Sequence, residues 1–320
     1  MKILVLSPID EGSLEALHRE HDVASAIGAG ASSLPSLAAD REVFVFRSGV
    51  TISEELLGSA PKLRLIVRAG SGLDNLDLTD ARRRGIRLVK IPGPSAQSVA
   101  ELTFGLMLDL ARKISRADRL VRQAQWPKHE LLGRLLFEKT VGIAGAGNIG
   151  SRVGELAVAW GMRAVGCVEH PDPAVAQALA HKGVELADLD EVLRVGDFVT
   201  VNLPLQESTR NLIDRRALSL MKPGSFLINV ARGGIVDEEA LYDELTAPNR
   251  LAGAALDVHA REGEGETSPF AQLPNVVLTP HIGSMTAECQ HAIGQRLLEI
   301  VSAFGRGELE GEVRNGELLL

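Results

Sequence analysis

The chain has 320 residues, more than one ordinary hydrophobic core requires, which favours two domains or one large α/β domain. With 45% apolar and 24% charged residues it is neither a disordered tail nor a coiled coil, and we expect it to fold alone. The formal charge of −8 and the aromatic content of 3% argue against nucleic acid as a partner, because binding nucleic acid requires clustered cations and stacking platforms.

The two cysteines, Cys167 and Cys289, lie far apart and have no CxxC spacing, so we expect neither a disulfide nor a metal site. The first apolar run stops at Ser7-Pro8 and is too short for the core of a signal peptide. No later run approaches the roughly 18 apolar residues of a membrane span. We therefore predict a cytoplasmic protein without a membrane partner.

Short β-branched runs, each followed by a polar, helix-like stretch, fill the N-terminal part of the chain. This alternation predicts a parallel sheet wrapped by helices. A Pro-Gly-Pro break at residues 92–94 then precedes apolar residues at helical spacing, which predicts one long helix over residues 95–122 that bridges two domains. The strands expected before the break are residues 2–7, 43–47, 63–67 and 86–91, with a weaker one at 22–25.

The second block of the chain repeats the alternation and predicts a complete doubly wound sheet of six strands. A last helical segment, residues 286–304, follows this block, and we expect it to pack back on the first one. The six strands expected are residues 141–144, 163–168, 198–202, 225–230, 253–257 and 276–279.

A glycine loop at residues 145–150, Gly-Ala-Gly-Asn-Ile-Gly, lies between a strand and a helical pattern, as a dinucleotide-binding fingerprint requires. Gly145 permits the tight turn, Gly147 lets the backbone approach a pyrophosphate, and Gly150 lets helix and strand pack closely. Free N–H groups at the helix start attract the phosphates. Glu169, at the end of the next strand, can accept from the adenosine ribose and repels a 2′-phosphate, so we predict NAD rather than NADP.

Six segments, in unbroken order between about residues 40 and 300, resemble the D-2-hydroxyacid dehydrogenase family. The segments are residues 68–75, 98–101, 145–150, 229–237, 253–258 and 274–283. Within the family, the first segment together with Arg47-Ser48 is most similar to D-3-phosphoglycerate dehydrogenases, here without their appended regulatory domain.

The resemblance implies an α/β protein of two doubly wound parallel-sheet domains. Residues 95–285 would form a Rossmann-type NAD-binding domain, and residues 1–94 with 286–320 a smaller, discontinuous, flavodoxin-like substrate domain. It also implies hydride transfer between nicotinamide and a D-2-hydroxy acid or 2-keto acid held between the domains. A homodimer would form through the nucleotide domains, with the 95–122 helix and the segment after it in the interface.

Such a reaction requires a base for the hydroxyl proton and a cation for the carboxylate. Arg232 follows a strand end, at the sheet edge where α/β proteins bind ligands, and its planar fork suits a carboxylate. Gly233-Gly234 beside it leave room for a ligand to approach. His281 follows the last strand, and imidazole is the side-chain type suited to proton transfer near neutral pH, so the resemblance makes His281 the base.

The resemblance also places a glutamate beside this base, where it fixes the imidazole tautomer. Glu262 occupies that position, but residues 259–263 replace the usual aromatic and acidic run, so Glu264 and Glu266 stay as alternatives. The seven histidines other than His281, His259 among them, lack comparable motif context, and we interpret them as surface or packing residues.

The remaining site residues are implied by the family alone. Asp257 is expected to accept from the nicotinamide carboxamide, and Val168 stands where the family commonly has the ribose-binding Asp. The cofactor-binding residues would be Gly145, Gly147, Asn148, Ile149, Gly150, Glu169, Leu203, Pro204, Ala231, Asp257, His281 and Gly283, and the substrate-binding residues Arg47, Arg68, Gly70, Ser71, Gly72 and Arg232.

Other functions stay open at this point. Arg47 and Arg68 lie near the positions that serve the substrate phosphate in the phosphoglycerate enzymes, but both can be structural, and Arg122 or Arg134 can contribute instead. Glyoxylate, hydroxypyruvate and lactate-type substrates are therefore alternatives. A formate-type dehydrogenase needs no general base and carries Gln where this chain has Glu262. A non-catalytic, NAD-sensing interaction protein of the same fold would tolerate loss of His281 and Glu262.

Overall fold

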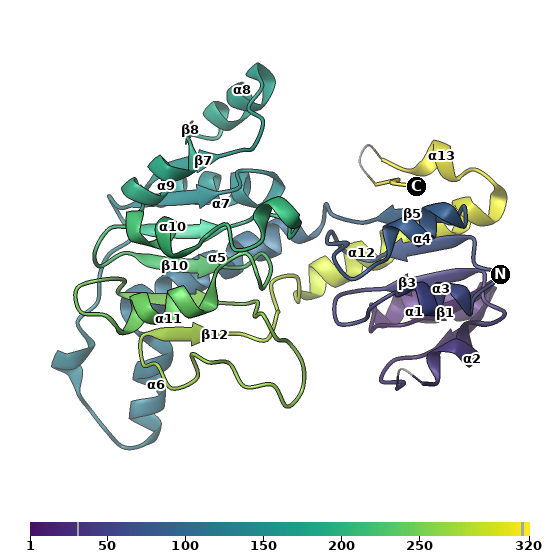
Figure 1. Ribbon diagram of the computed structural model, residues 1–320, viewed down its shortest axis with the longest axis horizontal. Coiled ribbons are helices and arrows are strands. Elements are labelled where there is room, and N and C mark those ends of the chain that lie inside the picture. Colours follow the sequence, from purple (N-terminus) through teal and green to yellow (C-terminus); the bar gives the residue numbers. More distant parts are fainter. Residues whose placement is uncertain (31, 315–316) are drawn as a thin grey trace. The chain divides into compact units, whose positions relative to one another are not determined.

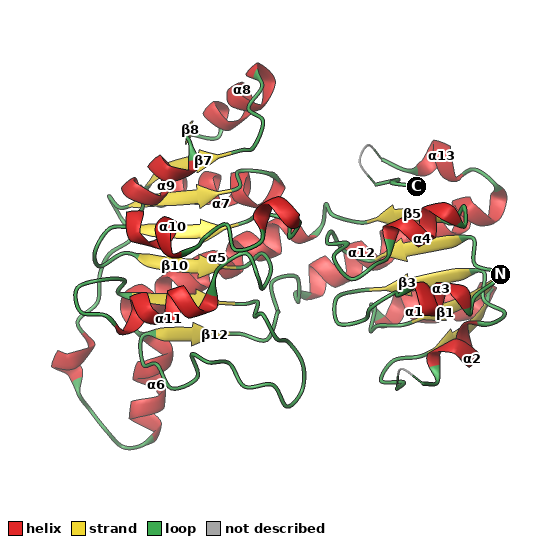
Figure 2. Ribbon diagram, viewed as in Figure 1, coloured by secondary structure: helices red, strands yellow, loops and turns green. Residues whose placement is uncertain are grey.

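The computed structural model describes residues 1–30, 32–314 and 317–320. They form two compact units, Met1–Ser95 with Ser284–Leu320, and Ala96–Gly283. Each unit is built on one parallel sheet with helices around it (Figures 1 and 2). The predicted α/β class with two parallel sheets is therefore confirmed.

The first unit carries a five-stranded sheet in the order β2-β1-β3-β4-β5. This is the 2-1-3-4-5 order of flavodoxin-like folds. Every strand predicted in this block is present, and its ends differ from the predicted ones by at most two residues. The strands are β1 (Lys2–Val5), β2 (Asp22–Ser25), β3 (Val43–Phe46), β4 (Leu65–Arg68) and β5 (Arg87–Lys90).

Both faces of this sheet are covered, which explains why β3 is apolar at every position. Its four residues are fully buried. Val43 and Val45 belong to the core cluster on the α12 face, and Phe44 and Phe46 to the cluster on the other face. The helices of this unit are α1 (Glu11–Glu20), α2 (Leu34–Ala38), α3 (Glu54–Gly58), α4 (Leu78–Arg83), α12 (Ala287–Arg306) and α13 (Leu309–Glu312).

Helix α12 returns to this sheet, as the sequence predicts for the last helical segment. The Thr286 hydroxyl caps the helix by accepting from the N–H of Cys289 at 3.3 Å. Gly294 lets α1 approach closely, because a Cβ there would lie 2.2 Å from the Ser13 hydroxyl. Leu297 and Ile300 complete the contact with the core of the sheet.

The second unit carries a seven-stranded sheet in the order β12-β11-β10-β9-β6-β7-β8. Numbered from β6, this is the Rossmann order 3-2-1-4-5-6 with a seventh strand at the far edge. The prediction of six strands missed β8, an edge strand of three residues in which only Val184 is buried. The strands are β6 (Thr140–Ala144), β7 (Arg163–Cys167), β8 (Val184–Leu186), β9 (Phe198–Val201), β10 (Phe226–Asn229), β11 (Gly253–Leu256) and β12 (Val276–Leu278).

Helices cover both faces of the seven-stranded sheet, and in Figure 1 α10 and α11 lie in front of it and α5 behind it. The predicted single helix over residues 95–122 is wrong, because Lys113 adopts a left-handed conformation with φ 57° and divides it into α5 and α6. The helices are α5 (Ser95–Arg112), α6 (Ile114–Arg122), η1 (Lys128–Leu131), α7 (Asn148–Ala159), α8 (Pro173–His181), α9 (Leu189–Val195), η2 (Glu207–Thr209), α10 (Arg215–Leu220) and α11 (Glu238–Thr246).

Among the described residues, we find no helix with both the length and the apolar character that crossing a membrane demands.

Candidate active site

Six loops that carry predicted site residues leave the same edge of the seven-stranded sheet. They follow β6, β7, β9, β10, β11 and β12, whose last residues are Ala144, Cys167, Val201, Asn229, Leu256 and Leu278. Because these strands are parallel, their carboxyl ends share one edge, and open α/β sheets bind ligands there. The sheet thus gathers segments that are up to about 140 residues apart in the chain.

The turn after β6 has the geometry of a phosphate-binding loop. Gly145 has φ +97°, and a Cβ there would lie 2.9 Å from the carbonyl oxygen of Asn202. A Cβ at Gly150 would lie 2.1 Å from the carbonyl oxygen of Gly145, so a side chain cannot fit there. At Gly147 no described atom lies within 4 Å of such a Cβ. The open side of the turn therefore faces space that a ligand can occupy.

Helix α7 begins at this open side, and no side chain among the described residues caps its first turn. Its N–H groups are thus available to an anion, and the helix dipole favours negative charge there. The predicted cradle residues Asn148 and Ile149 are the first two residues of this helix. Of the other predicted cofactor residues, Leu203 lies against Gly145, and the Pro204 carbonyl accepts from the Thr209 hydroxyl at 2.6 Å.

Glu169 comes two residues after the end of β7. Its side chain is 64% exposed, and its carboxylate lies 3.9 Å from the ring of His170. Val168, between the strand and Glu169, is half-buried against the core. The exposed carboxylate is therefore free to meet a ribose, one position later than the family's acid.

Asp257, at the end of β11, organises the segment that carries His281. Its buried carboxylate accepts from the Thr279 hydroxyl at 2.6 Å and from the N–H groups of Ile282 and Gly283 at 2.8 and 2.9 Å. Its carbonyl accepts from the N–H of His281 at 2.8 Å. These bonds hold His281 at φ +55°, a left-handed conformation unusual for a residue with a side chain. Sequence reasoning assigned Asp257 to the cofactor and missed this role.

His281 and Glu262 form a hydrogen-bonded pair. Nδ1 of the imidazole lies 2.8 Å from Oε2 of the carboxylate, with side-chain exposures of 25% and 37%. The second oxygen, Oε1, accepts from the N–H of His259 at 3.1 Å. The alternatives Glu264 and Glu266 are exposed, with no hydrogen bond to His281 among the described residues.

The environment of the pair favours an ionised carboxylate. Burial raises the pKa of Glu262, but hydrogen bonds from the His281 ring and from the His259 N–H, with the charge of the imidazoles, bring this pKa below its ordinary value. Glu262 therefore stays an acceptor through the neutral range, which fixes the hydrogen of the His281 ring on Nδ1 and leaves Nε2 as the ring atom available to a ligand.

Arg232 lies in the turn after β10, and Asn229 shapes this turn. The Asn229 side chain accepts from the N–H of Ala231 at 3.1 Å and donates to the carbonyl of Arg232 at 3.0 Å. One guanidinium nitrogen of Arg232 donates to the Ala231 carbonyl at 2.7 Å.

Gly233 makes room for the chain itself, whereas the sequence suggested room for a ligand. A Cβ at Gly233 would lie 1.9 Å from the carbonyl oxygen of His259 and 2.7 Å from the nitrogen of Ala260. The turn that carries Arg232 therefore packs directly on the loop that leads to Glu262. Gly234 is required for another reason, its φ of +80°.

The predicted substrate residues of the first unit are held by their own neighbours. Arg47 donates to the Ser284 hydroxyl at 3.1 Å and to the side-chain oxygen of Gln290, and its burial lowers the pKa of the guanidinium. Arg68 is 4% exposed, donates to the Gly72 carbonyl at 2.7 Å and stacks on Phe46 at 5.3 Å from the ring centre.

The glycine-rich turn after Arg68 is shaped around that arginine. Gly70 has φ +156°, and a Cβ there would lie 2.9 Å from the guanidinium of Arg68. Ser71 is exposed at the tip of the turn.

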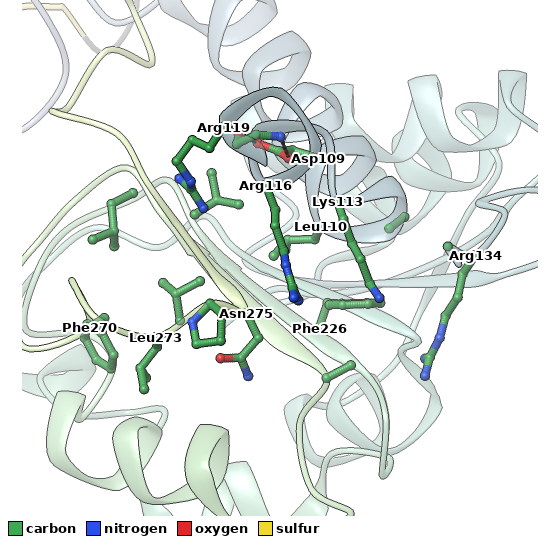
Figure 3. A pocket seen from close by; sticks show the side chains of 18 of the residues that line it. Asp109, Leu110, Lys113, Arg116, Arg119, Arg134, Phe226, Phe270, Leu273 and Asn275 are labelled. Atoms are coloured by element: carbon green, nitrogen blue, oxygen red, sulfur yellow. Dashed lines mark hydrogen bonds between the residues drawn. The ribbon is translucent and has the colours of Figure 1, made fainter. Parts of the chain in front are cut away.

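A separate cavity of about 720 Å³ lies in the second unit beside α5, α6 and β12. Figure 3 shows basic side chains around it, Lys113, Arg116, Arg119 and Arg134. Asp109 also lines the cavity, but its carboxylate accepts hydrogen bonds from the N–H and the hydroxyl of Ser115. Of the residues considered for the substrate, Arg134 alone is among the described residues that line this cavity, which includes no residue of the glycine turn, the Arg232 turn or the Glu262–His281 pair, so it is distinct from the candidate active site.

Comparison with known proteins agrees with this geometry. The sheet order and glycine turn place the second unit among dinucleotide-binding α/β domains. Residues 104–283 match the family model described as "D-isomer specific 2-hydroxyacid dehydrogenase, NAD binding domain". The chain belongs to the D-isomer specific 2-hydroxyacid dehydrogenase family, which confirms the resemblance seen in its motifs.

Three relatives illustrate the range of the family. A D-3-phosphoglycerate dehydrogenase of Methanocaldococcus jannaschii is 38% identical over 98% of this chain and 59% of its own length. A hydroxypyruvate reductase of Thermotoga maritima is 41% identical over 81% of this chain and 83% of its own length. The structure of a D-lactate dehydrogenase from Aquifex aeolicus with NAD and lactic acid matches with a TM-score of 0.86 and 28% identity, over 99% of this chain and 98% of the other. The chain spans about three fifths of the phosphoglycerate dehydrogenase that it matches.

Proposed function

We propose that this protein is an NAD-dependent dehydrogenase that interconverts D-2-hydroxy acids and 2-keto acids. The observation that carries the proposal is the Glu262–His281 pair, 2.8 Å apart, at the same sheet edge as the glycine turn and the Arg232 turn. A base, a cation and a dinucleotide cradle at one edge are the groups that this reaction needs. In this proposal residues 95–285 bind the cofactor, and residues 1–94 with 286–320 form the substrate domain.

His281 acts as the proton carrier. Glu262 occupies Nδ1, so Nε2 takes the hydroxyl proton during oxidation and returns it to the keto oxygen during reduction. Arg232 holds the carboxylate with its planar fork and fixes the orientation of the substrate. When bound, the nicotinamide cofactor accepts or supplies the hydride at its C4.

The cofactor residues fit a dinucleotide, because the open side of Gly147 and the uncapped start of α7 together provide space and N–H donors for a pyrophosphate. We propose NAD as the preferred cofactor, since the carboxylate of Glu169 is exposed beyond β7 and would repel a 2′-phosphate. A location in the cytoplasm is part of the proposal, because Cys167 and Cys289 are free and buried, which suits a reducing compartment.

A small, unphosphorylated 2-keto acid such as hydroxypyruvate or glyoxylate is favoured as the substrate. The cations considered for a phosphate, Arg47 and Arg68, are both engaged by groups of the chain itself. The relatives named above support either class, so 3-phosphoglycerate is the second candidate.

A spectrophotometric screen tests the proposal. NADH and NADPH oxidation would be followed with glyoxylate, hydroxypyruvate, pyruvate and phosphohydroxypyruvate, and the reverse reaction, reduction of NAD or NADP, with 3-phosphoglycerate, D-lactate and formate. We expect NADH to be consumed with at least one of the unphosphorylated acids. Absence of turnover with every acid and both cofactors would favour a non-catalytic NAD-binding protein, and turnover of formate alone would favour a formate-type enzyme.

Gly147→Ala should weaken NADH binding without harming the fold. The new methyl group meets no described atom within 4 Å, but it occupies the side from which a pyrophosphate must approach the backbone. We expect the Kd for NADH to rise about tenfold, the loss of roughly one hydrogen bond to a charged group, with an unchanged melting temperature. Calorimetric titration measures the first and differential scanning fluorimetry the second. An unchanged Kd would show that the cofactor does not bind at this turn.

We further propose that the protein is a homodimer formed through α6 and the segment after it. No residue of α6 is buried among those described, although Ile114 and Val121 are apolar. Trp126 and Leu132 are 80% and 83% exposed, and Leu132 is one of the residues that line the basic cavity of Figure 3. So much exposed apolar surface in one segment marks an interface, and the occupant we propose is a second copy of this chain.

Trp126→Asp should dissociate this dimer, and Trp126 is not among the residues that line the basic cavity. Burying an unpaired carboxylate in an apolar interface costs about 2 kcal/mol or more per subunit, so light scattering should give the mass of one chain where the wild type gives two. The matched control is Ile27→Asp, which changes an exposed apolar residue of the other unit and should leave the mass unchanged. A wild-type protein of single-chain mass would contradict the proposal.

A further inference from the structure

His259 lies where the three segments of the candidate active site meet. It precedes Glu262 by three residues in the loop after β11, and it is half-buried. The sequence indicated only a surface or packing role for it, because it lacks the motif context that His281 has. Its ring, its N–H group and its carbonyl each contact a different part of the site.

The ring connects the loop to the segment that carries His281. Nε2 of His259 lies 3.1 Å from the carbonyl oxygen of Thr279. A carbonyl oxygen only accepts, so Nε2 carries the hydrogen of this bond. Nδ1 is buried with no hydrogen-bond partner in the described part of the chain. The bond from Nε2 is therefore the ring's hydrogen bond among the described residues, and its acceptor, Thr279, is two residues before His281.

The backbone of His259 makes the other two contacts. Its N–H donates to Oε1 of Glu262 at 3.1 Å, while Oε2 of the same carboxylate faces the His281 ring. Its carbonyl oxygen lies where a Cβ of Gly233 would be only 1.9 Å away, so the turn that carries Arg232 rests on this peptide. A shift of His259 would thus move Glu262, Arg232 and His281 relative to one another.

We propose that His259 is a positioning residue, whose Nε2 bond to Thr279 sets the distance between the Glu262 loop and the His281 segment. This inference rests on the proposed function for its effect on turnover, but the bond itself can be tested independently. His259 need not touch the substrate. Its role is to keep Glu262 on Nδ1 of His281 and the Arg232 turn beside them.

The charged groups around the loop define what a pH profile reports. Glu262 contacts the ring of His281 and the N–H of His259, and from α11 Glu238 accepts from the N–H of Ala260 at 2.7 Å. Arg261 is exposed beside them. The pKa of Glu262 is lowered, so function that needs its ionised form is lost only as the pH falls through that lowered pKa. If Glu262 is displaced, its pKa rises back toward the ordinary value. The loss of activity on the acid side of the pH profile then moves to higher pH.

Three substitutions of His259 distinguish its hydrogen bond to Thr279 from the presence of an aromatic ring and of a titrating group. His259→Gln keeps a neutral N–H donor near the place of Nε2, His259→Asn puts its amide near the place of Nδ1, and His259→Phe keeps a ring without a donor. We expect kcat to fall about 10- to 100-fold in the Phe and Asn variants, as misplacement by about 1 Å can do, and the acid side of their pH profiles to move to higher pH. The Gln variant should stay within about threefold of wild type. The Kd for NADH should be unchanged in all three.

A second readout does not depend on turnover. Hydrogen–deuterium exchange of peptides covering residues 257–263 and 278–283 should be faster in the Phe and Asn variants and unchanged in the Gln variant. If the wild type turns over no acid, the proposed function is wrong, and the exchange data still test the Thr279 bond. Wild-type kcat and exchange in the Phe variant, or equal losses in the Gln and Phe variants, would overturn the inference.

Discussion

Replacing His281 is expected to lower kcat by about 10²- to 10⁴-fold, the contribution of a positioned acid or base. Nδ1 of this imidazole is occupied by Glu262, and Nε2 is the ring atom left to exchange a proton with the substrate. Without the ring, water must take that role in a site where it is not positioned. Single-turnover oxidation of NADH with the best 2-keto acid of the screen measures the loss.

The choice of substitution matters because His281 has φ +55°. Alanine tolerates this left-handed conformation poorly, whereas asparagine is enriched there. His281→Asn is therefore the matched partner of His281→Ala, since it removes the titrating group with less strain on the turn. Calorimetric titration of both variants with NADH shows how much of any loss comes from weaker cofactor binding, because His281 is also among the predicted cofactor residues. Turnover at the wild-type rate in His281→Asn would remove His281 from the mechanism.

Arg232→Lys is expected to reduce kcat/KM for the keto acid by roughly 10- to 150-fold, equivalent to about 1.5–3 kcal/mol for a hydrogen bond to a charged group. A lysine keeps the positive charge, but a point charge cannot make two parallel bonds to a carboxylate. The loss should fall mainly on KM, because the substrate carboxylate is held in the ground state and in the transition state alike.

The control for Arg232→Lys is Arg215→Lys. Arg215 is exposed and pairs with Asp243 on the helical face of the same unit, so this substitution should leave both kinetic constants unchanged. Steady-state kinetics with a varied keto acid concentration decide between the outcomes. An Arg232→Lys variant with the wild-type KM and kcat would show that the guanidinium binds no carboxylate.

Local patterns were sufficient to predict most of the fold. The strands of both sheets are short apolar runs with polar stretches between them, and that signal is present in the sequence itself. Edge strand β8 escaped because Glu185 and Leu186 are exposed, so an apolar run is missing there. The break between α5 and α6 was not predicted because a lysine at position 113 does not indicate a left-handed conformation, as a glycine or an asparagine would.

The individual residues of the candidate site could be predicted from the sequence, but the contacts between the loops that carry them could not. The glycine turn and the positions of Arg232, Glu262 and His281 follow from motifs and strand ends. Which loop rests on which is a tertiary contact between segments that are distant in sequence, and no local pattern encodes it. Gly233 illustrates this limit, since its missing side chain admits the peptide of His259. Asp257 is a second case, because its carboxylate holds the turn around His281.

The most direct test of the account is a crystal structure of the protein with NADH and oxamate, an unreactive analogue of a 2-keto acid. We predict that the oxamate carboxylate lies within about 2.7–3.2 Å of two guanidinium nitrogens of Arg232, and its keto-like oxygen within the same distance of Nε2 of His281. Oxamate bound away from these two side chains, or Arg232 and His281 too far apart to contact one such molecule, would contradict the proposed chemistry.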